Sequence, residues 1–357
     1  MTPVTRRAVL GSLALAVTMP GAPRGASAQV AAEAVVAGMS LRQQVARMFM
    51  FPISGPVLLP EEARWLETLQ PGGVILVQQN FGTAAEVQAL TAALHATNPV
   101  LPPLVALDQE GGIVSRLADD PAPDATVLGT LPLAQISELA GQRAALLAAY
   151  GFDVNFAPVA DVAFSPDSFM AGRTFGADPQ QVADCVVAYL EGVAASGVLH
   201  CVKHFPGHGR VTVDSHSALP VLEVDAETWL AQEAVPFAAA VAAGVPMVML
   251  GHLAVPMWDD LPASLSPLAV QALREDLGFA GVIVTDDLFM GALDAWAPLE
   301  IVDLALEAGV DLLLYVGVPD TPLALVNHVV NRVLQGEVPE DRITASAQRI
   351  VTAQLAR

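Results

Sequence analysis

Cysteine is scarce in this chain. Only two cysteines, Cys185 and Cys201, occur among 357 residues, and their separation is not the CxxC spacing of thiolate zinc or redox sites. A chain of this length can bury a large core without covalent cross-links. We therefore expect two buried thiols rather than a disulfide, with Cys185 in a helix and Cys201 in a strand.

Positive charge is also scarce. Lysine and arginine number 16 against 37 aspartates and glutamates, which gives a formal net charge of −21. Surfaces that bind nucleic acid need clustered lysine and arginine to neutralise phosphates. The composition therefore argues against a nucleic-acid partner and favours neutral or cationic ligands.

The N-terminal apolar run is too short to cross a membrane, for which about 20 residues are needed. It ends near Met19 and follows a twin-arginine start, Thr5-Arg6-Arg7-Ala8-Val9-Leu10. Ala26-Ser27-Ala28 fits the small-x-small pattern of a cleavage site. We predict a twin-arginine-type signal peptide over residues 1–28, no stable membrane insertion, and a periplasmic or secreted protein. A disordered or anchoring N-terminus is the alternative, and the protein would then be cytoplasmic.

The rest of the chain, residues 29–357, alternates short apolar runs with longer segments of 3.6-residue periodicity. Nearly continuous apolar strands are typical of a parallel sheet covered by helices on both faces. About eight such units without a linker predict an α/β fold, a single TIM (β/α)8 barrel. A doubly wound open sheet is the alternative, but no GxGxxG motif follows the first strand.

The expected strands are 46–51, 73–77, 104–107, 154–157, 198–202, 246–250, 282–285 and 311–316. The expected helices include 31–47, 84–95, 133–149, 179–195, 226–243, 267–277 and a closing helix over 340–355.

Polar side chains fall at the carboxyl ends of these strands, which is the face where barrel enzymes carry their active sites. The residues concerned are Asp108, Asp161, Lys203, His204, His252 and Asp286.

The stretch 203–216 is the densest in titratable groups, with one lysine, three histidines and an aspartate. Asp214 and His216 project to the same side if the backbone is extended. A carboxylate that holds one imidazole nitrogen raises the pKa of the histidine and suits it to act as a general acid near neutrality. A local hydrogen bond without catalytic meaning is the alternative.

Asp286 ends a buried strand, where a carboxylate can act as a nucleophile or stabilise positive charge. Asp287 should point to the other side of the strand, or cap the following helix. The histidines could in principle form a metal cluster, but no HExxH or similar spacing supports one, and we expect no metal.

The stretch 203–216 resembles the KHFPGHGxxxxDSH signature of glycoside hydrolase family 3, in its bacterial β-N-acetylglucosaminidase (β-hexosaminidase) branch. Residues 108–112 resemble the DQEGG segment of that family, and Arg116 stands at the place of its downstream arginine. Similar segments at 156–162, 172–175 and 284–290 extend the resemblance over essentially all of the predicted mature chain.

The resemblance implies a cofactor-free TIM barrel and a retaining double displacement. Asp286 would be the nucleophile, and His216, oriented by Asp214, would be the acid and base in place of the second carboxylate of most glycosidases. Many family members carry a second domain that supplies the acid; this chain ends too early for one, which fits the histidine branch. The implied sugar contacts are Asp108, Arg116, Arg173, Lys203 and His204, with His252 a weaker candidate.

We therefore expect an exo-β-N-acetylhexosaminidase acting on a small carbohydrate, a muropeptide or chitooligosaccharide containing N-acetylglucosamine. The alternatives are a phosphorylase, because a histidine base repels phosphate less than a carboxylate would, and another family 3 enzyme such as a β-glucosidase. A non-catalytic barrel that binds peptidoglycan sugars is a third alternative, against which the intact Asp214, His216 and Asp286 argue. The oligomeric state is left open, and a monomer is compatible with the sequence.

Two features depart from the family pattern. Ile113 stands where the family usually has arginine, so one charge near the sugar site is missing. The export leader is the other departure, because Gram-negative members of this branch are typically cytoplasmic.

Overall fold

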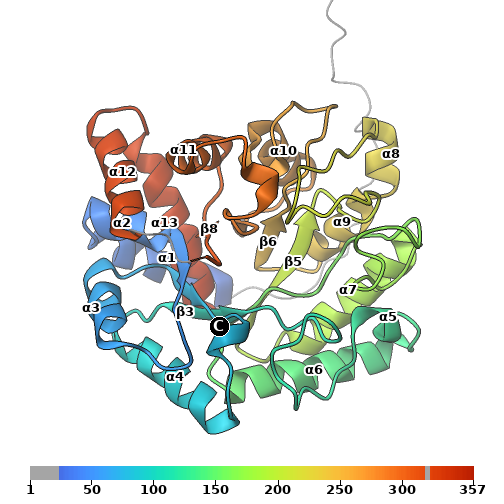
Figure 1. Cartoon of the computed structure of the whole chain (residues 1–357), viewed down its shortest axis with the longest axis horizontal. Helices are drawn as coiled ribbons and strands as arrows, with labels where there is room; N and C mark the ends of the chain where they lie inside the picture. Colours follow the sequence, from blue (N-terminus) through green and yellow to red (C-terminus); the bar gives the residue numbers. More distant parts are fainter. Residues whose placement is uncertain (1–23, 318–321) are drawn as a thin grey trace, which may run out of the picture.

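The computed structural model describes residues 24–317 and 322–357. In this part of the chain, eight parallel strands form the centre of the molecule and helices surround them (Figure 1). From the first strand to the seventh, each strand pairs in parallel with the next one along the chain, and the first strand also pairs with the last. A bridge between Val284 and Leu312 joins the two ends of the strand order, with 3.0 Å between the Thr285 nitrogen and the Leu312 oxygen. The predicted single TIM (β/α)8 barrel is confirmed.

The strands lie close to the positions expected from the sequence. They are β1 (Phe49–Pro52), β2 (Gly73–Ile75), β3 (Leu104–Leu107), β4 (Val154–Asn155), β5 (Leu199–Phe205), β6 (Met247–Leu250), β7 (Val282–Thr285) and β8 (Leu313–Leu314).

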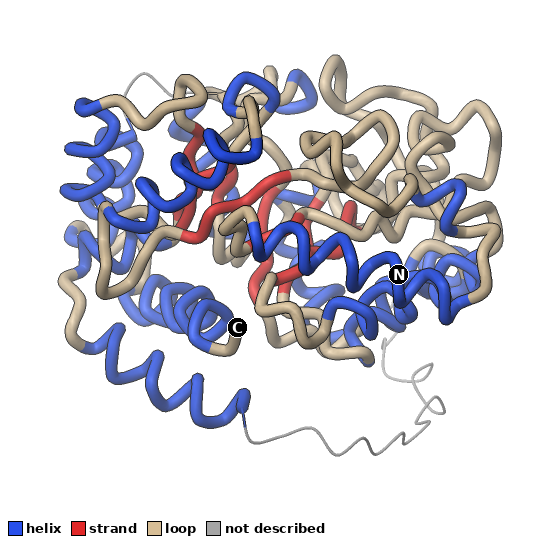
Figure 2. Tube along the Cα trace, turned by 90° about the horizontal axis from the view of Figure 1, so that it is seen from below, coloured by secondary structure: helices blue, strands red, loops and turns tan. Residues whose placement is uncertain are grey.

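The helices form the outer layer, and Figure 2 shows them around the central strands, with long loops gathered mainly on one side. The α-helices are α1 (Arg24–Ala37), α2 (Leu41–Arg47), α3 (Pro60–Leu69), α4 (Ala84–Ala96), α5 (Ala125–Leu128), α6 (Leu133–Ala149), α7 (Pro179–Val193), α8 (Ala226–Ala231), α9 (Ala234–Ala242), α10 (Pro267–Gln271), α11 (Pro298–Ala308), α12 (Pro322–Leu334) and α13 (Glu340–Leu355). Short 3₁₀ turns are η1 (Gln78–Asn80), η2 (Ala263–Leu265) and η4 (Gly291–Leu293), and η3 (Ala272–Asp276) is a π-helical continuation of α10.

Side-chain caps fix where several helices begin. Thr83 and Glu86 form a capping box at the start of α4, in which the Glu86 carboxylate accepts from the Thr83 nitrogen at 2.7 Å. Asp178 caps α7 by accepting from the Gln181 nitrogen at 2.8 Å, and Pro179 follows at the first helical position, where no backbone donor is needed.

Two helices predicted as continuous are each divided in the structure. The helix expected over 31–47 becomes α1 and α2, because Ser40 caps a new start at Leu41. The helix expected over 226–243 becomes α8 and α9. Pro236 has no N–H to donate to the carbonyl of Gln232, so the ladder of hydrogen bonds is interrupted there.

The core explains why the strands are apolar on both faces. One cluster of buried residues draws on all eight strands and includes Leu104 and Ala106 of β3. The alternate residues Val105 and Leu107 enter a second cluster with residues of α4 and α6. Successive side chains of a strand point to opposite faces, and here both faces are covered. Both cysteines are buried and free, Cys185 in α7 and Cys201 in β5, as expected.

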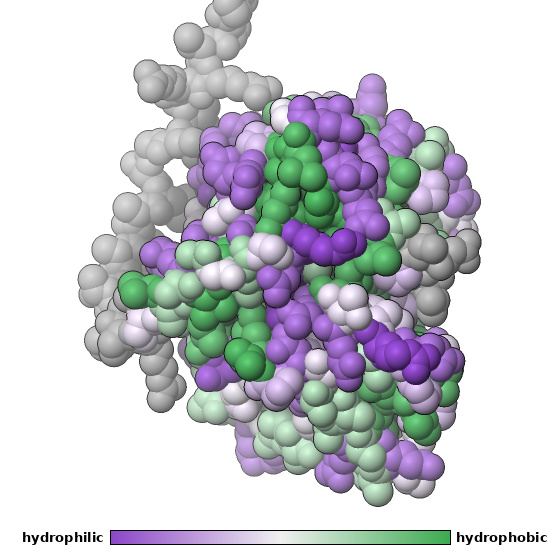
Figure 3. Space-filling model, turned by 90° about the vertical axis from the view of Figure 1, so that its left-hand side faces the viewer, coloured by the Kyte–Doolittle hydropathy of each residue, from purple (hydrophilic) through white to green (hydrophobic). Residues whose placement is uncertain are grey.

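The N-terminal helix α1 packs on α13 through Ala32 and Val36, which contact Ala347 and Val351. The twin-arginine motif and the apolar run after it lie outside the described residues. None of the described helices combines the length and apolar character needed to cross a bilayer. On the face that carries α2, α3 and α12, hydrophobic patches are interspersed with hydrophilic residues (Figure 3).

Candidate active site

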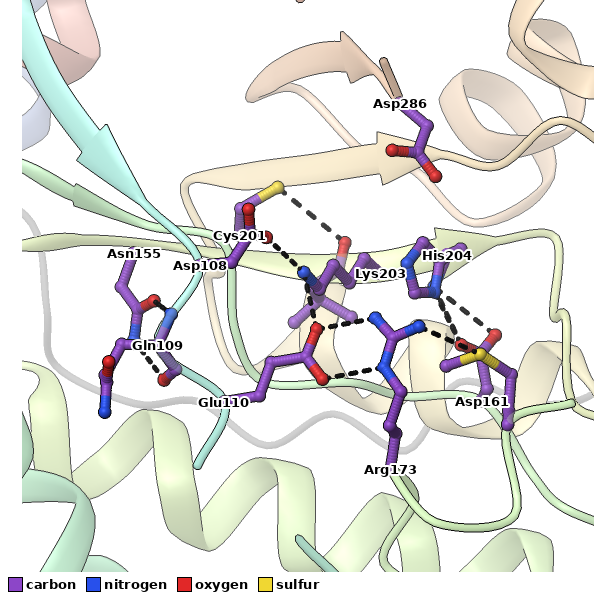
Figure 4. Close-up of polar contacts among 12 residues, drawn as sticks. Asp108, Gln109, Glu110, Asn155, Asp161, Arg173, Cys201, Lys203, His204 and Asp286 are labelled. Atoms are coloured by element: carbon purple, nitrogen blue, oxygen red, sulfur yellow. Dashed lines mark hydrogen bonds and ion pairs between the residues drawn. The ribbon is translucent and has the colours of Figure 1, made fainter. Parts of the chain in front are cut away.

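The polar cluster expected at the strand ends is present. Asp108 follows β3, Lys203 and His204 lie near the end of β5, and Asp286 follows β7. In Figure 4 the carboxylate of Asp286 points toward Lys203 and His204. Strand β5 is longer than predicted, so Lys203 and His204 belong to the strand and the loop begins at Pro206.

Lys203 is buried between two carboxylates. Its Nζ lies 2.6 Å from Asp108 Oδ1 and 2.7 Å from Glu110 Oε1. Burial alone would lower the pKa of Lys203, but the charges of Asp108 and Glu110 outweigh it and raise the pKa. The lysine therefore keeps its positive charge. We call the floor of the site the group formed by Lys203, His204, Arg173 and the carboxylates that contact them, Asp108, Glu110 and Asp161.

Glu110 joins this lysine to Arg173, a contact that sequence reasoning missed. Its Oε1 and Oε2 lie 2.7 Å and 2.9 Å from Arg173 Nη2 and Nε, a two-pronged ion pair. Burial alone would raise the pKa of Glu110, but Lys203 and Arg173 lower it to about 2. The only sequence signal for this role was the place of Glu110 within the DQEGG segment.

Asp161 is fully buried and holds His204 and the backbone of His208 in place. Its Oδ2 lies 2.7 Å from His204 Nδ1, and its Oδ1 accepts from the backbone nitrogen of His208 at 2.6 Å. Burial would raise the pKa of Asp161, but His204 and the donors around it lower it. The sequence predicts a polar residue here, at the carboxyl end of a strand, but it does not predict the contacts of Asp161 with two histidines.

Asp286 is held by backbone contacts at the mouth of β7. Its own nitrogen donates to the Leu250 carbonyl at 2.9 Å, and its Oδ1 accepts from the Asp287 nitrogen at 2.8 Å. Burial would raise its pKa, but His204, His252, the Asp287 N–H and Lys203 lower it. The carboxyl is therefore ionised and available as a nucleophile at neutral pH.

Asp287 lies beyond the end of β7, next to Asp286, and makes contacts of its own with the backbone. Its Oδ1 accepts from the nitrogens of Val316 at 2.8 Å and Phe289 at 3.1 Å, which ties the segment to the chain after β8. Burial and the nearby Asp286 raise the pKa of Asp287 to about 6. One oxygen of this carboxyl is therefore occupied by two backbone donors of the protein.

His252 also supports this segment. It is buried, with Nδ1 2.7 Å from Ser264 Oγ and Nε2 2.9 Å from the carbonyl oxygen of Asp287. Both ring nitrogens are therefore occupied by protein groups. The sugar contact expected for His252 stays a prediction, and its visible contacts hold the backbone beside Asp286.

Asp214 and His216 form the expected pair. Asp214 Oδ1 lies 2.7 Å from His216 Nδ1 and also accepts from the His216 backbone nitrogen at 2.9 Å. These contacts outweigh burial and lower the pKa of Asp214. The His216 side chain is 63% exposed, so its Nε2 is open to a ligand.

The segment that carries this pair lies against the turn that follows Asp286. The nitrogens of Gly291 and Ala292 donate to the carbonyl oxygens of His216 and Ser215, both at 3.1 Å. The segment that carries Asp214 and His216 is thus joined through η4 to the segment that carries Asp286, although the two come from different loops.

The family model for the glycosyl hydrolase family 3 N-terminal domain matches residues 40–353. The chain belongs to glycosyl hydrolase family 3. A β-hexosaminidase of Stenotrophomonas maltophilia is 36% identical over 278 residues, which cover 75% of this chain and 82% of that protein. A β-hexosaminidase of Bordetella avium is 38% identical, over 76% of this chain and 81% of that protein.

Solved structures of the family are similar in fold. A family 3 β-N-acetylglucosaminidase from Paenibacillus sp. is 32% identical with a TM-score of 0.86, and the match covers 89% of this chain and 63% of that one. A β-N-acetylhexosaminidase from Beutenbergia cavernae is 34% identical with a TM-score of 0.80, and the match covers 89% of this chain and 99% of that one. The chain therefore spans less than two thirds of the Paenibacillus protein but nearly all of the Beutenbergia protein.

The family resemblance also concerns Arg116 and Ile113. Arg116 is half-buried, and its Nε has no hydrogen-bond partner among the described residues. Ile113, at the place of the usual arginine, is 79% exposed. The sugar contact expected for Arg116 stays a prediction.

The size of a hollow does not locate this site. Adjoining hollows of about 580 and 660 Å³ lie at the opposite end of the barrel, and both are lined by Gly244, Val245 and Pro246, just before β6. In the described residues, no group of three or more histidine, cysteine, aspartate or glutamate side chains is placed to hold a metal ion. The titratable cluster at the carboxyl ends of the strands marks the candidate active site.

Replacing Glu110 with glutamine should destabilise the fold. The change leaves Lys203 and Arg173 facing a neutral amide, and we expect the free energy of unfolding at pH 7 to fall by about 3 kcal/mol. Because the pKa of Glu110 is lowered on folding from 4.5 to about 2, its contribution is complete above about pH 4.5 and is lost as the pH falls toward 2. Urea unfolding at several pH values measures this.

The matched control is Glu307→Gln, in an exposed ion pair with Arg332, which should leave stability nearly unchanged. A loss for Glu110→Gln as small as that of the control would contradict the assigned ion-pair network.

Replacing Gly291 with alanine should impair catalysis more than folding. A β-carbon at this position would lie 2.7 Å from the His216 carbonyl oxygen, so the segment bearing His216 must shift. Since misplaced catalytic groups lose large factors in rate, we expect kcat on an aryl β-N-acetylglucosaminide to fall about 10-fold or more. Gly55→Ala is the control, because no atom lies within 4 Å of its added carbon. Equal kcat values for the two variants would refute the docking of the acid–base segment on η4.

Proposed function

We propose that this protein is a retaining exo-β-N-acetylhexosaminidase that removes terminal β-linked N-acetylglucosamine. The observation that carries the proposal is the pairing of an ionised Asp286, above a charged floor, with a separate Asp214–His216 pair joined to it through η4. The names of the family relatives, β-hexosaminidase and β-N-acetylglucosaminidase, support the same substrate.

The first step forms a covalent glycosyl-enzyme. A carboxylate oxygen of Asp286 attacks the anomeric carbon while the bond from that carbon to the glycosidic oxygen breaks. The leaving oxygen takes the proton from Nε2 of His216, whose Nδ1–H is held by Asp214. Asp214 stabilises the positive charge of the imidazolium and fixes the plane of the ring.

The second step returns the enzyme to its starting state. A water molecule attacks the anomeric carbon, gives a proton to Nε2 of His216, and displaces the carboxylate of Asp286. Two inversions at one carbon leave the product with the configuration of the substrate. No charge or proton is left over at the end of the cycle.

The floor residues are suited to hold the terminal sugar. Asp108 can accept hydrogen bonds from sugar hydroxyls, and its charge is balanced by Lys203. His204, oriented by Asp161, and Arg173, oriented by Glu110, have fixed positions before a ligand binds. Such preorganisation limits the entropy lost on binding. We assign these residues, with Arg116, to the sugar subsite.

The proposed natural substrates are muropeptides or chitooligosaccharides outside the cytoplasm. The twin-arginine motif and the small-x-small site at 26–28 support export of the protein. The residues that pack α1 onto α13, Ala32 and Val36, lie after the proposed cleavage point and would be kept in the mature protein.

One assay tests the reaction and the nucleophile together. Wild type and Asp286→Asn are incubated with aryl β-N-acetylglucosaminide and aryl β-glucoside, with and without phosphate. We expect wild type to hydrolyse the N-acetylglucosaminide at least about 10-fold better than the glucoside, without need of phosphate. Asp286→Asn should lose about 1000-fold or more in kcat, because an amide is a poor nucleophile.

Other results would change the assignment. Equal activity on the glucoside would contradict the hexosaminidase, and formation of a sugar 1-phosphate as the main product would favour a phosphorylase. Thermal unfolding of Asp286→Asn serves as the folding control.

Export is tested by the N-terminus of the secreted protein. We expect full-length chain expressed in a bacterium with a twin-arginine pathway to be recovered from the periplasm or medium beginning at Gln29. An Arg6→Lys, Arg7→Lys variant should stay in the cytoplasm. Recovery of both forms in the cytoplasm with residues 1–28 intact would contradict the export proposal.

A further inference from the structure

His208 is buried beside the site but has no part in the reaction described above. Its Nε2 lies 3.1 Å from Ser215 Oγ, and its backbone nitrogen donates to Asp161 Oδ1 at 2.6 Å. Its Nδ1 is buried without a hydrogen-bond partner among the described residues. A buried histidine with one nitrogen engaged and one unsatisfied is costly to maintain, so its contacts call for an explanation.

Ser215 lies between the two residues of the acid–base pair. Asp214 and His216 turn outward, with side chains 40% and 63% exposed, whereas Ser215 is buried. The hydroxyl of Ser215 thus ties the segment, whose two neighbouring side chains are partly exposed, to the buried ring of His208. The same segment is also held by the backbone bonds from η4 to the carbonyl oxygens of Ser215 and His216.

Phe169 supports the same arrangement from a third loop. Its ring centroid lies 5.6 Å from that of His208 and 6.2 Å from that of His216, where the rings meet edge to face. The Phe169 backbone nitrogen donates to the Val211 carbonyl at 3.2 Å. The loop that carries Arg173 is therefore bound to the loop that carries His216.

We propose that His208 and Ser215, with Phe169, are positioning residues that hold His216 in the orientation needed for proton transfer. The inference rests on the proposed function, in which His216 is the acid and base. A proton donor must lie within hydrogen-bond reach of the leaving oxygen, and the exposed His216 owes its position to this buried contact. Through Asp161, the same chain of contacts reaches His204, so the sugar floor and the acid are held by one carboxylate.

This role predicts a loss that depends on the leaving group. A dinitrophenolate leaves without protonation, whereas the sugar alcohol of chitobiose needs an acid. In Ser215→Ala, kcat/KM for chitobiose should fall about 10-fold or more, and kcat/KM for 2,4-dinitrophenyl β-N-acetylglucosaminide should change less than about 3-fold. A merely structural loss would lower both values equally.

Further variants separate the hydrogen bond from packing. Ser217→Ala, two residues along and exposed, is the matched control and should match wild type on both substrates. His208→Gln, which can still reach Ser215 with an amide, should keep more chitobiose activity than His208→Ala. His208→Ala added to Ser215→Ala should cost little more than the worse single change, because both break one contact. His216→Ala gives the full leaving-group effect for comparison.

Each outcome bears on a distinct claim. If Ser215→Ala loses activity equally on both substrates, or loses none on chitobiose, the positioning role is overturned while the proposed function stands. If wild type cleaves neither substrate, the proposed function fails, and this inference fails with it. Should His208→Ala not fold, the Ser215→Ala and Ser217→Ala pair decides the question alone.

Discussion

The candidate site depends on the hydrogen bonds that the buried carboxylate of Asp161 accepts. This carboxylate has no solvent exposure, and it accepts from the ring of His204 and from the backbone of His208. Removing a charge from water costs several kcal/mol unless hydrogen bonds replace the lost solvation. The donors must therefore be in place whenever the protein is folded, which fixes both the end of β5 and the start of the loop that leads to His216.

The site gathers basic side chains although the chain as a whole is acidic. The chain is strongly acidic, but the floor under Asp286 gathers Lys203, His204 and Arg173. Each of these three side chains lies within ion-pair distance of a carboxylate, which takes the place of solvent around it. His204, His252, the Asp287 N–H and Lys203 lower the pKa of Asp286 against the effect of burial, so its carboxylate is ionised at neutral pH.

The sequence was sufficient to predict the barrel and most of the residues at its mouth. Apolar strands covered on both faces leave a pattern that can be read directly, and β3, α6 and α13 have the predicted bounds. Polar residues such as Asp108 and Asp286 stood out because they interrupt that pattern at strand ends. Breaks within helical stretches were harder to foresee, since a single cap at Ser40 decided one of them.

Contacts between loops could not be predicted. Glu110 and Arg173 are 63 residues apart, and neither segment contains a pattern that predicts its contact with the other. The hydrogen bond between His208 and Ser215 is closer in sequence, but it depends on how the loop folds over Phe169. The direction of His252, toward Ser264 and the Asp287 backbone, is likewise a result of tertiary packing. The sequence pattern and the motifs predict which residue types lie near the site, whereas the contacts between them depend on the tertiary structure.

Trapping of the glycosyl-enzyme would identify the nucleophile. Incubation with a 5-fluoro N-acetylglucosaminyl fluoride slows both steps and should let the intermediate accumulate. We predict one sugar per chain, bound to Asp286 in the peptide that spans β7, as measured by mass spectrometry of the digested protein. A sugar bound to Asp287 or to any other residue would contradict it.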